Sequence, residues 1–557
     1  MKYLKKININ IYFILFFVFI FSSSIFVDFQ IHSDDIFFHL NRIQGLKDAF
    51  LDGQFLPKIY PYTNNGYGYA NSLFYCDIFF YPAAILYMLG FSLVISYKIM
   101  LFTYIIIGTI LVNYLANKLF KNNFKLIFII MSIYCLNPYR YIVCFYRSAF
   151  SEFLAITFLP IVIYSFIEIF YNHKNRPVMT AMALSLILLS HNISFIFISI
   201  IYVILYLVYF ITSKSNRKDI TILTLKVMIL GFLITMFYTL PMLEQLFHQE
   251  FKVQYFSEYF DLSTTTTKFK DLINPLMPIN TLDYVLETIT NYSTGIVAIF
   301  IPLLNINKIK NKWILTLTII HYVIIAIIIG IIPIHLIDIL NTVQFVFRFN
   351  FIIIFTSITL VSYALYNSHR YYRYFAIGIL LVNIIISNYN IINICPYRYN
   401  QDISYENLYN FDTTNMQYNN YQLGGGEYLP YLIYSDDYYI DSKKIKTLID
   451  TNKIDLDINY NRKYTKFEFN YQSDNSTYLM LPLTYYYGYR VYAINDKEKI
   501  KLDVYNDNIY KKVSFNTLVG DNKYYIYYHG TNIQLFSLII SLITLLSLMF
   551  NKVKTLT

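Results

Sequence analysis

Charged residues are scarce in this sequence. Only 14% of its 557 residues are Asp, Glu, Lys or Arg, whereas 56% are hydrophobic, and the mean hydropathy is +0.44. Because a soluble globular domain carries roughly 25% charged residues, the composition excludes that class and predicts a membrane protein. The net charge of +10 does not indicate nucleic-acid binding if the basic residues lie in loops on one side of a bilayer.

Features that would mark other protein classes are also missing. The four cysteines have neither metal-site spacing nor the pattern of a disulfide framework; they are Cys76, Cys135, Cys144 and Cys395. The basic N-terminus and the apolar run at 11–27 resemble a signal peptide, but no small-residue cleavage site follows, so we expect a retained membrane anchor. The chain has no internal repeat at solenoid periods and no low-complexity linker.

Apolar runs recur along the chain and predict an α-helical membrane protein with about twelve spans. Several runs are shorter than the ~20 residues that a crossing helix needs, so flanking aromatic residues must extend them. The segment 77–90, which contains Pro82, is too short to span and is predicted to be a re-entrant or surface-lying helix. The twelve runs lie at 11–27, 93–116, 124–136, 153–170, 177–190, 193–211, 220–240, 292–306, 313–332, 349–365, 375–386 and 535–550.

The basic residues predict the orientation of these spans. When the spans are numbered in order, every basic loop falls on the side of the N-terminus, and the positive-inside rule makes that side cytoplasmic. These loops contain Lys118, Lys121, Lys125, Lys174, Arg176, Lys214, Arg217, Lys218, Lys308, Lys310, Lys312, Arg370, Arg373, Lys552 and Lys554. We therefore expect a multi-pass protein of the cell membrane, with both termini cytoplasmic and the segments 28–92, 137–152, 241–290 and 389–531 outside.

The region 389–531 is a different kind of sequence. Short runs of alternating polarity at 464–471, 477–483, 489–494 and 523–528 are separated by turn-forming Asn, Asp and Gly residues. Such alternation is typical of antiparallel strands and predicts an extracytoplasmic β-sandwich-like domain. We therefore divide the chain into a transmembrane domain at 1–388 with its first outer loop at 28–92, a β-rich domain at 389–531, and a last span with a basic tail at 532–557.

The first outer loop opens with two adjacent carboxylates, Asp34 and Asp35. If the next residues are helical, Asp35 and His39 lie one turn apart on one face, and Arg42 is a neighbour of both. A carboxylate, an imidazole and a guanidinium that meet at a membrane surface can serve in acid–base catalysis and anion binding. The alternative is a solvated loop in which Ser33 or Asp34 caps the helix.

Other ionisable residues stand at the predicted outer ends of spans. Arg147 and Glu152 occupy a membrane boundary, where such groups face a cavity or pair with one another; a structural ion pair at the rim is the alternative. Arg348 begins a later span and is either a substrate contact or an interface anchor. His191 lies between two apolar runs and is either a catalyst or a hydrogen-bonding residue at a helix end.

Two further segments in the C-terminal part attract attention. The three glycines at 424–426 follow no strand into a helix and lack the lysine and hydroxyl of a phosphate loop. They instead allow a close backbone approach to the membrane-domain cavity, which Glu427 would line. The aromatic patch at 481–490 is expected to be sandwich core, although its rings could also stack on sugars.

These features together resemble a known family. The motifs are the anchor followed by Asp35-x-x-x-His39-Leu-x-Arg42-Ile, then Gly53-x-x-x-Pro57, Gly66-Tyr-Gly-Tyr69, Phe74-Tyr75, Arg147 with Glu152, Ser190-His191, Gln344-Phe-x-x-Arg348-Phe, Glu427-Tyr-Leu-Pro430 and Pro482-x-x-Tyr-Tyr-x-Gly488. They are short but cover nearly the whole chain. The sequence is similar to the GT-C superfamily of integral-membrane glycosyltransferases, and more narrowly to the bacterial branch often labelled pyruvoyl-tetrahydropterin synthase-related membrane proteins.

The resemblance implies an activity and a division of roles. It implies a polyprenyl-phosphate-linked sugar donor, an envelope glycan as acceptor, inverting transfer on the outer face, and a carboxylate of the first outer loop as general base. Asp35 matches that acidic position best, with His39 beside it, while Asp34 assists or binds a divalent metal; no other cofactor is indicated. The candidate substrate-binding residues are Arg42, Arg147, Glu152, His191, Arg348 and Glu427.

Two other functions compete with this one. A non-catalytic lipid or polysaccharide transporter would need ionisable residues deep in mid-helix or paired broken helices, whereas the charges here gather at the predicted outer rim. A surface-display or sensory protein would need only one anchor for its β-domain, so about twelve spans argue against it. Besides the donor and acceptor, the predicted partners are membrane lipids and not nucleic acid.

Overall fold

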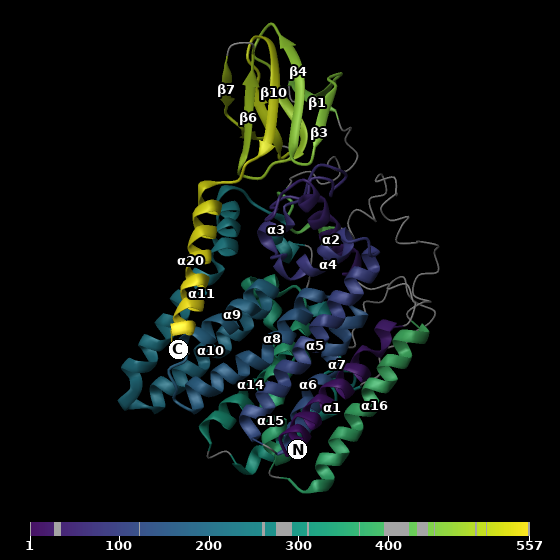
Figure 1. Ribbon diagram of the computed structural model, residues 1–557, viewed down its shortest axis with the longest axis vertical. Coiled ribbons are helices and arrows are strands. Elements are labelled where there is room, and N and C mark those ends of the chain that lie inside the picture. Colours follow the sequence, from purple (N-terminus) through teal and green to yellow (C-terminus); the bar gives the residue numbers. More distant parts are fainter. Residues whose placement is uncertain are drawn as a thin grey trace. The chain divides into compact units, whose positions relative to one another are not determined.

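The computed structural model describes residues 2–26, 35–121, 123–258, 262–274, 292–308, 311–366, 368–394, 423–431, 444–449, 452–495, 498–507 and 510–554. These residues are mostly helical, with an antiparallel β-domain near the C-terminus (Figure 1). Contacts divide the chain into two units. The helical unit comprises Met1–Ile36, Lys98–Phe232 and Phe256–Asp402, and the mixed unit comprises Phe37–Tyr97, Leu233–Tyr255 and Ile403–Thr557.

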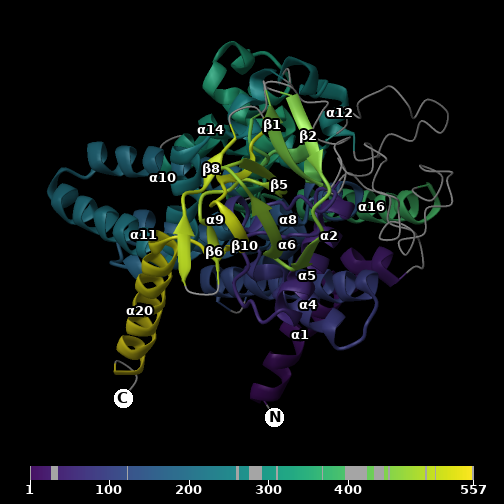
Figure 2. The same cartoon turned by 90° about the horizontal axis from the view of Figure 1, so that it is seen from above.

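The helical unit is built from apolar helices with few internal charges. Its main helices are α1 (Lys2–Ser22), α5 (Leu93–Phe120), α6 (Phe124–Cys135), α7 (Pro138–Tyr141), α8 (Phe150–Phe166), α9 (Pro177–Ser190), α10 (Asn192–Thr212), α11 (Arg217–His248), α14 (Lys312–Ile328), α15 (Asn350–Tyr366) and α16 (Arg370–Ile394). The start of α5 and the second half of α11, from Leu233, belong to the mixed unit. Hydrogen bonds of Tyr202 to Thr224 and of Tyr206 to Thr221 join α10 to the first half of α11, and the two helices lie side by side in both views (Figure 2).

Membrane-spanning length is reached by only some of these helices. Seven described helices are long and apolar enough to cross, and the pair Phe124–Cys135 and Pro138–Tyr146, bent by 49° at its break, would make an eighth. The predicted twelve spans are therefore not confirmed. Several predicted runs form helices of only 10–17 residues, such as Pro177–Ser190 and Lys312–Ile328. The run at 292–306 forms only a short helix, α13 (Ile296–Phe300), before Pro302 and a 3₁₀ segment.

The β-domain consists of two five-stranded antiparallel sheets, ordered β2-β1-β5-β9-β8 and β3-β4-β10-β6-β7. Side chains of both sheets share one buried core, which includes Leu479, Phe515, Phe469 and Tyr524, and this is the arrangement of a sandwich. The predicted antiparallel domain is thus confirmed. The strands are β1 (Ile445–Ile449), β2 (Asn452–Leu456), β3 (Tyr460–Lys463), β4 (Lys466–Ser473), β5 (Tyr478–Thr484), β6 (Tyr489–Ile494), β7 (Lys499–Leu502), β8 (Tyr505–Asn506), β9 (Lys512–Asn516) and β10 (Gly520–Tyr528).

The mixed unit joins the first loop of the chain to this sandwich. The loop contains α2 (Ile36–Leu51), α3 (Asn71–Phe74) and α4 (Tyr81–Met88), the last with its proline in the first turn. Its apolar residues Leu73 and Phe74 belong to the core of the sandwich, and Arg462 of β3 donates to the Pro61 carbonyl at 2.7 Å. This grouping differs from the predicted ranges, which placed the loop with the transmembrane domain.

The last helix completes the mixed unit. α20 (Asn532–Lys554) lies alongside the end of α11 (Figure 1), and its Ser541 hydroxyl donates to the Leu233 carbonyl at 2.9 Å. Its outer surface is strongly apolar and exposed, as expected for a helix that faces lipid.

Candidate functional site

Four segments of the helical unit bring ionisable side chains together at breaks between helices. The cluster consists of Asp35, Arg147, Glu152, His191 and Arg348, and we call it the acid–base cluster. Ion pairs or charge–charge interactions connect each member to another. Five of the nine predicted site residues therefore converge in one place.

Arg147 and Glu152 form the centre of this cluster. Arg147 lies between the π-helical turn Ile142–Tyr146 and α8, where Ser148 takes a left-handed conformation with φ +49° and turns the chain into the new helix. Arg147 Nη1 donates to Glu152 Oε2 at 2.8 Å, and the two side chains are 4% and 3% exposed. The ion pair that we considered as the structural alternative is thus present, but it is buried and does not lie at a solvated rim.

Aromatic groups complete the surroundings of the pair. Tyr139 donates from its hydroxyl to Glu152 Oε1 at 2.6 Å, and the Arg147 guanidinium lies 4.8 Å from the ring centre of Phe347. Burial by itself lowers the pKa of Arg147, but the negative charge of Glu152 outweighs it and raises that pKa well above its ordinary value. The guanidinium therefore stays charged.

Asp35 has a partly exposed side chain. Its backbone amide donates to the Arg147 carbonyl at 3.0 Å, which ties the turn before α2 to the centre of the cluster. Its Oδ2 lies 4.0 Å from Arg147 Nη2, and its side chain is 38% exposed. This distance is too long for a direct hydrogen bond between these two side chains, so the contact is an ion pair alone. Asp34, the predicted partner, lies outside the described residues.

His191 and Arg348 stand at the ends of neighbouring helices. His191 joins α9 to α10, and its Nδ1 lies 2.8 Å from the Ser194 hydroxyl and accepts from the Ser194 amide at 3.3 Å. Burial lowers the pKa of His191 to about 3, so the ring is neutral near pH 7. Arg348 donates to the Val343 carbonyl at 3.0 Å and to the Gln344 side chain, and its charge acts on Glu152.

His39 and Arg42 are held in the mixed unit by a different network. Arg42 Nη1 lies 3.4 Å from His39 Nδ1, as predicted for neighbours on one helix face. The guanidinium, however, donates to Asp77 at 2.6 Å and to the Cys76 carbonyl at 3.0 Å, and both charged side chains are almost fully buried. This geometry gives Arg42 a structural partner and leaves it little access to a ligand.

Asp77 is the residue that sequence reasoning missed. Besides Arg42, it accepts hydrogen bonds from the hydroxyls of Tyr60 and Ser72, both at 2.5 Å. Burial, followed by the negative charge of Asp77, raises the pKa of Tyr60 well above its ordinary value. One signal was available, because Asp77 is the only acidic residue between Asp52 and Glu152, and an isolated acid in apolar sequence needs a cationic or hydroxyl partner.

Glu427 also belongs to the mixed unit. It follows the 3₁₀ turn Gly424–Gly426, and its backbone carbonyl accepts from the Val253 amide at 2.9 Å. A Cβ at Gly424 would lie 3.2 Å from the Phe38 ring of α2. The close backbone approach that the glycines predicted therefore takes place against the first loop. The patch at 481–490 is largely core, as expected, with Leu481 and Tyr486 fully buried.

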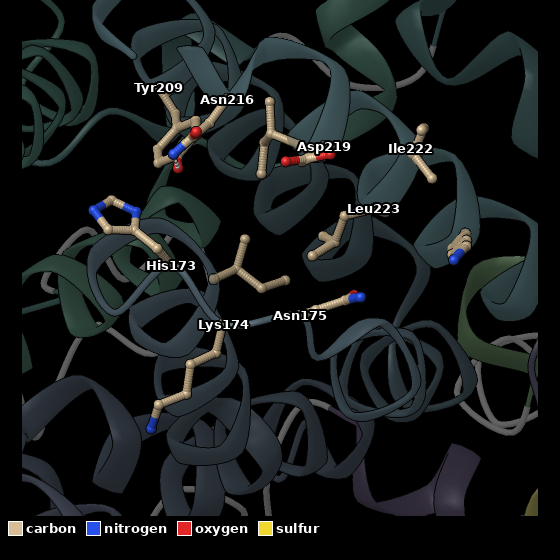
Figure 3. A pocket seen from close by; sticks show the side chains of 11 residues that line it. His173, Lys174, Asn175, Tyr209, Asn216, Asp219, Ile222 and Leu223 are labelled. Atoms are coloured by element: carbon tan, nitrogen blue, oxygen red, sulfur yellow. Dashed lines mark hydrogen bonds between the residues drawn. The ribbon is translucent and has the colours of Figure 1, made fainter.

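A cavity of about 400 Å³ opens elsewhere in the helical unit, near the junctions of α10 with α11 and of η4 (Ile167–Tyr171) with α9. Figure 3 shows His173, Tyr209, Asn216 and Asp219 around it, with the Lys174 side chain directed away from them. Lys174 pairs with Glu168 at 3.0 Å. None of the predicted site residues lines this cavity.

The metal prediction rests on Asp34 alone. Among the described residues, no group of three His, Cys, Asp or Glu side chains could hold a metal ion. Comparison with protein families, curated proteins and solved structures finds no match for this chain.

Proposed function

We propose that this chain is a GT-C-type membrane glycosyltransferase that moves a sugar from a polyprenyl-phosphate-linked donor to an envelope glycan. The observation that carries the proposal is the placement of a buried, permanently charged guanidinium 4.0 Å from a carboxylate that is 38% exposed. Such a transfer needs a cation for the departing phosphate and a base for the incoming hydroxyl. The Arg147 and Asp35 side chains offer both groups at one place.

The chemistry follows from these two side chains. Asp35 accepts the proton of an acceptor hydroxyl while the hydroxyl oxygen attacks the anomeric carbon of the donor sugar. The bond between that carbon and the phosphate oxygen breaks, and the lipid phosphate leaves with the bonding electrons. Arg147 offsets the charge that develops on the phosphate. Attack from the face opposite the leaving group inverts the anomeric centre.

The buried carboxylate of Glu152 has a supporting role in this proposal. It accepts a hydrogen bond from Nη1 of the Arg147 guanidinium, whereas Nη2 lies toward Asp35. Tyr139 holds the second oxygen of Glu152 at 2.6 Å. This arrangement fixes the orientation of Arg147, as a positioning residue must.

The full topology forms part of the proposal. The described helices support several membrane spans, and the one-sided basic loops support a multi-pass arrangement with both termini in the cytoplasm. In that orientation the segment before α2 lies outside, where a polyprenyl-phosphate-linked donor and an envelope glycan are both accessible.

One observation favours a second candidate, a lipid or polysaccharide transporter. The helix pair Phe124–Cys135 and Pro138–Tyr146 is bent by 49° and carries Arg140, whose three side-chain nitrogens are buried without a hydrogen-bond partner. Broken helices with buried charges are typical of transporters. The rings of Phe21 and Tyr134, however, lie 4.1 and 4.6 Å from this guanidinium and stabilise it by cation–π contact.

Mass spectrometry of the purified protein tests the proposed donor. The full chain, extracted in a mild detergent, is expected to retain a polyprenyl-phosphate sugar. Arg147→Lys keeps the charge but loses the fork geometry that matches a phosphate, so it should retain several-fold less lipid. Arg370→Lys, at the start of α16 and outside the cluster, is the matched control. A wild-type protein that carries no such lipid, or equal retention in Arg147→Lys, would contradict the proposal.

A further inference from the structure

A second cavity, of about 300 Å³, lies within the mixed unit. Its wall is formed by the loop segment 54–58, by Phe237 of α11, and by the chain from Tyr528 to Leu538, which includes the first turns of α20. The stretch Asn532–Phe550 of α20 is one of the candidate membrane spans. The cavity therefore lies at the N-terminal end of a candidate span, and the end of a crossing helix stands at the level of lipid headgroups.

Lys58 supplies this cavity with an ammonium group, on which Cys76 and Asp77 act through their charges. It lines both this cavity and a small adjoining one beside Cys76 and Asp77. Its ammonium makes no hydrogen bond or ion pair with any residue in the described part of the chain. Burial lowers the pKa of Lys58, and Cys76 and Asp77 oppose this shift only in part. A bound anion would stabilise the charged form.

Two carboxylates that interact with residues of the cavity wall already accept hydrogen bonds. Asp77 accepts from Arg42 at 2.6 Å and from the hydroxyls of Tyr60 and Ser72. Glu244 of α11 accepts from the Thr531 hydroxyl at 2.6 Å. Neither carboxylate is therefore a free partner for the ammonium.

Another part of the wall offers hydrogen-bond donors. Thr531 caps α20 by accepting from the Gln534 amide at 3.2 Å, and the first turn of this 23-residue helix faces the cavity. Amides of a first helical turn, together with the positive end of the helix dipole, favour an anion. The polar side chains of Gln54, His529 and Asn532 also line the cavity.

The remaining wall is apolar. Leu56, Phe237, Leu535 and Leu538 line it, and the adjoining surface of α20 exposes Leu535 and Phe536 to 61% and 59%. A small soluble anion would gain nothing from this wall, whereas an acyl chain would bury against it. The cavity thus combines one cation, helix amides and an apolar exit along a candidate span.

We propose that this cavity binds the phosphate headgroup of an anionic membrane lipid, with Lys58 as the cation that neutralises the phosphate. The acyl chains lie along the exposed apolar face of α20. This site uses none of the acid–base cluster, so it stands independently of the proposed transfer reaction.

Lipid titration of the purified full-length chain tests this assignment. Short-chain phosphatidylglycerol, phosphatidylcholine and inorganic phosphate are titrated separately, and binding is followed by native mass spectrometry and by the thermal midpoint. We expect phosphatidylglycerol to bind and the other two probes to leave the midpoint unchanged. Lys58→Gln should weaken phosphatidylglycerol binding about tenfold or more, as for a lost charge-assisted hydrogen bond. Lys466→Gln, at an exposed position of β4 outside the cavity, should not weaken it.

A second variant tests the site independently, in case Lys58→Gln does not fold. Asn532 is exposed at the start of α20, so Asn532→Asp favours the helix through its dipole and yet repels a phosphate. It should weaken phosphatidylglycerol binding several-fold without lowering the thermal midpoint of the lipid-free protein. Wild-type binding in both variants would overturn the site. If inorganic phosphate raised the thermal midpoint as much as phosphatidylglycerol does, the ligand would not be a lipid. If phosphatidylcholine bound as tightly as phosphatidylglycerol, the negative charge of the headgroup would have no role in binding.

Discussion

Removal of the negative charge of Glu152 should destabilise the helical unit strongly. Glu152 and Arg147 are 2.8 Å apart and only 3% and 4% exposed, so Glu152→Gln leaves a buried guanidinium without its counter-ion. Breaking a buried pair on one side costs about 3–5 kcal/mol. The Asp35 carboxylate lies 4.0 Å from the Arg147 guanidinium and is 38% exposed, so it offsets little of the lost free energy. We expect a loss of about 3 kcal/mol or more, seen as a fall of about 3–5 °C or more in the thermal midpoint in detergent.

A matched carboxylate provides the control. Glu168 is equally buried, at 4%, but its partner Lys174 is 50% exposed, so water can solvate the lysine after Glu168→Gln. That variant should lose under about 1 kcal/mol. The double variant Arg147→Met/Glu152→Leu removes both buried charges and should recover most of the stability, but it should not retain the lipid donor. Wild-type stability in Glu152→Gln, or donor retention in the double variant, would refute this reasoning.

Three further predictions concern other parts of the chain. Asp77→Asn should lower the thermal midpoint, because it leaves the buried Arg42 without its charge partner. An unchanged midpoint would show that this pair does not stabilise the fold. Burial lowers the pKa of His191 from 6.5 to about 3 in the folded protein. Between pH 6.5 and pH 3 only the unfolded state therefore binds a proton at His191. The free energy of unfolding should then fall by ~1.4 kcal/mol for each pH unit below 6.5. Thermal midpoints at pH 7 and 5 should fall less in His191→Asn, which keeps the helix cap; equal falls would contradict this. Impermeant cysteine labelling from outside should reach a probe at Asp457 and miss one at Lys310, and the reverse pattern would overturn the orientation.

Local patterns in the sequence predicted much of the fold. The alternation of polarity at 489–494 coincides with β6 at Tyr489–Ile494, because every second side chain of a half-buried strand faces the core. The apolar runs predicted helices, but not their length as spans, because hydropathy alone does not show where Pro302 or a π-helical turn ends a helix. The union of the first loop with the sandwich core depends on contacts between residues far apart in the chain, and no local period reports such contacts.

The site was predictable only where its members are close in sequence. Arg147 and Glu152 are five residues apart, and their opposite charges in apolar sequence indicated a pair. The approach of Asp35 to Arg147 depends on how distant segments pack. The pattern around Arg42 correctly placed His39 beside it, but the partner that occupies its guanidinium is Asp77, 35 residues later. Helical spacing reports neighbours on one helix and not partners from another segment.

Sugar transfer by Asp35→Asn tests the central claim most directly. The purified full chain is incubated with a radiolabelled polyprenyl-phosphate sugar and an envelope glycan acceptor, and transferred label and bound donor are measured in parallel. Asparagine keeps the size and most of the hydrogen bonding of aspartate but is no base, so transfer should fall by about a hundredfold to ten-thousandfold with donor binding nearly unchanged. Asp34→Asn should lower stability more than rate. Near-full transfer by Asp35→Asn, together with its loss in Asp34→Asn, would contradict the account and make Asp34 the base.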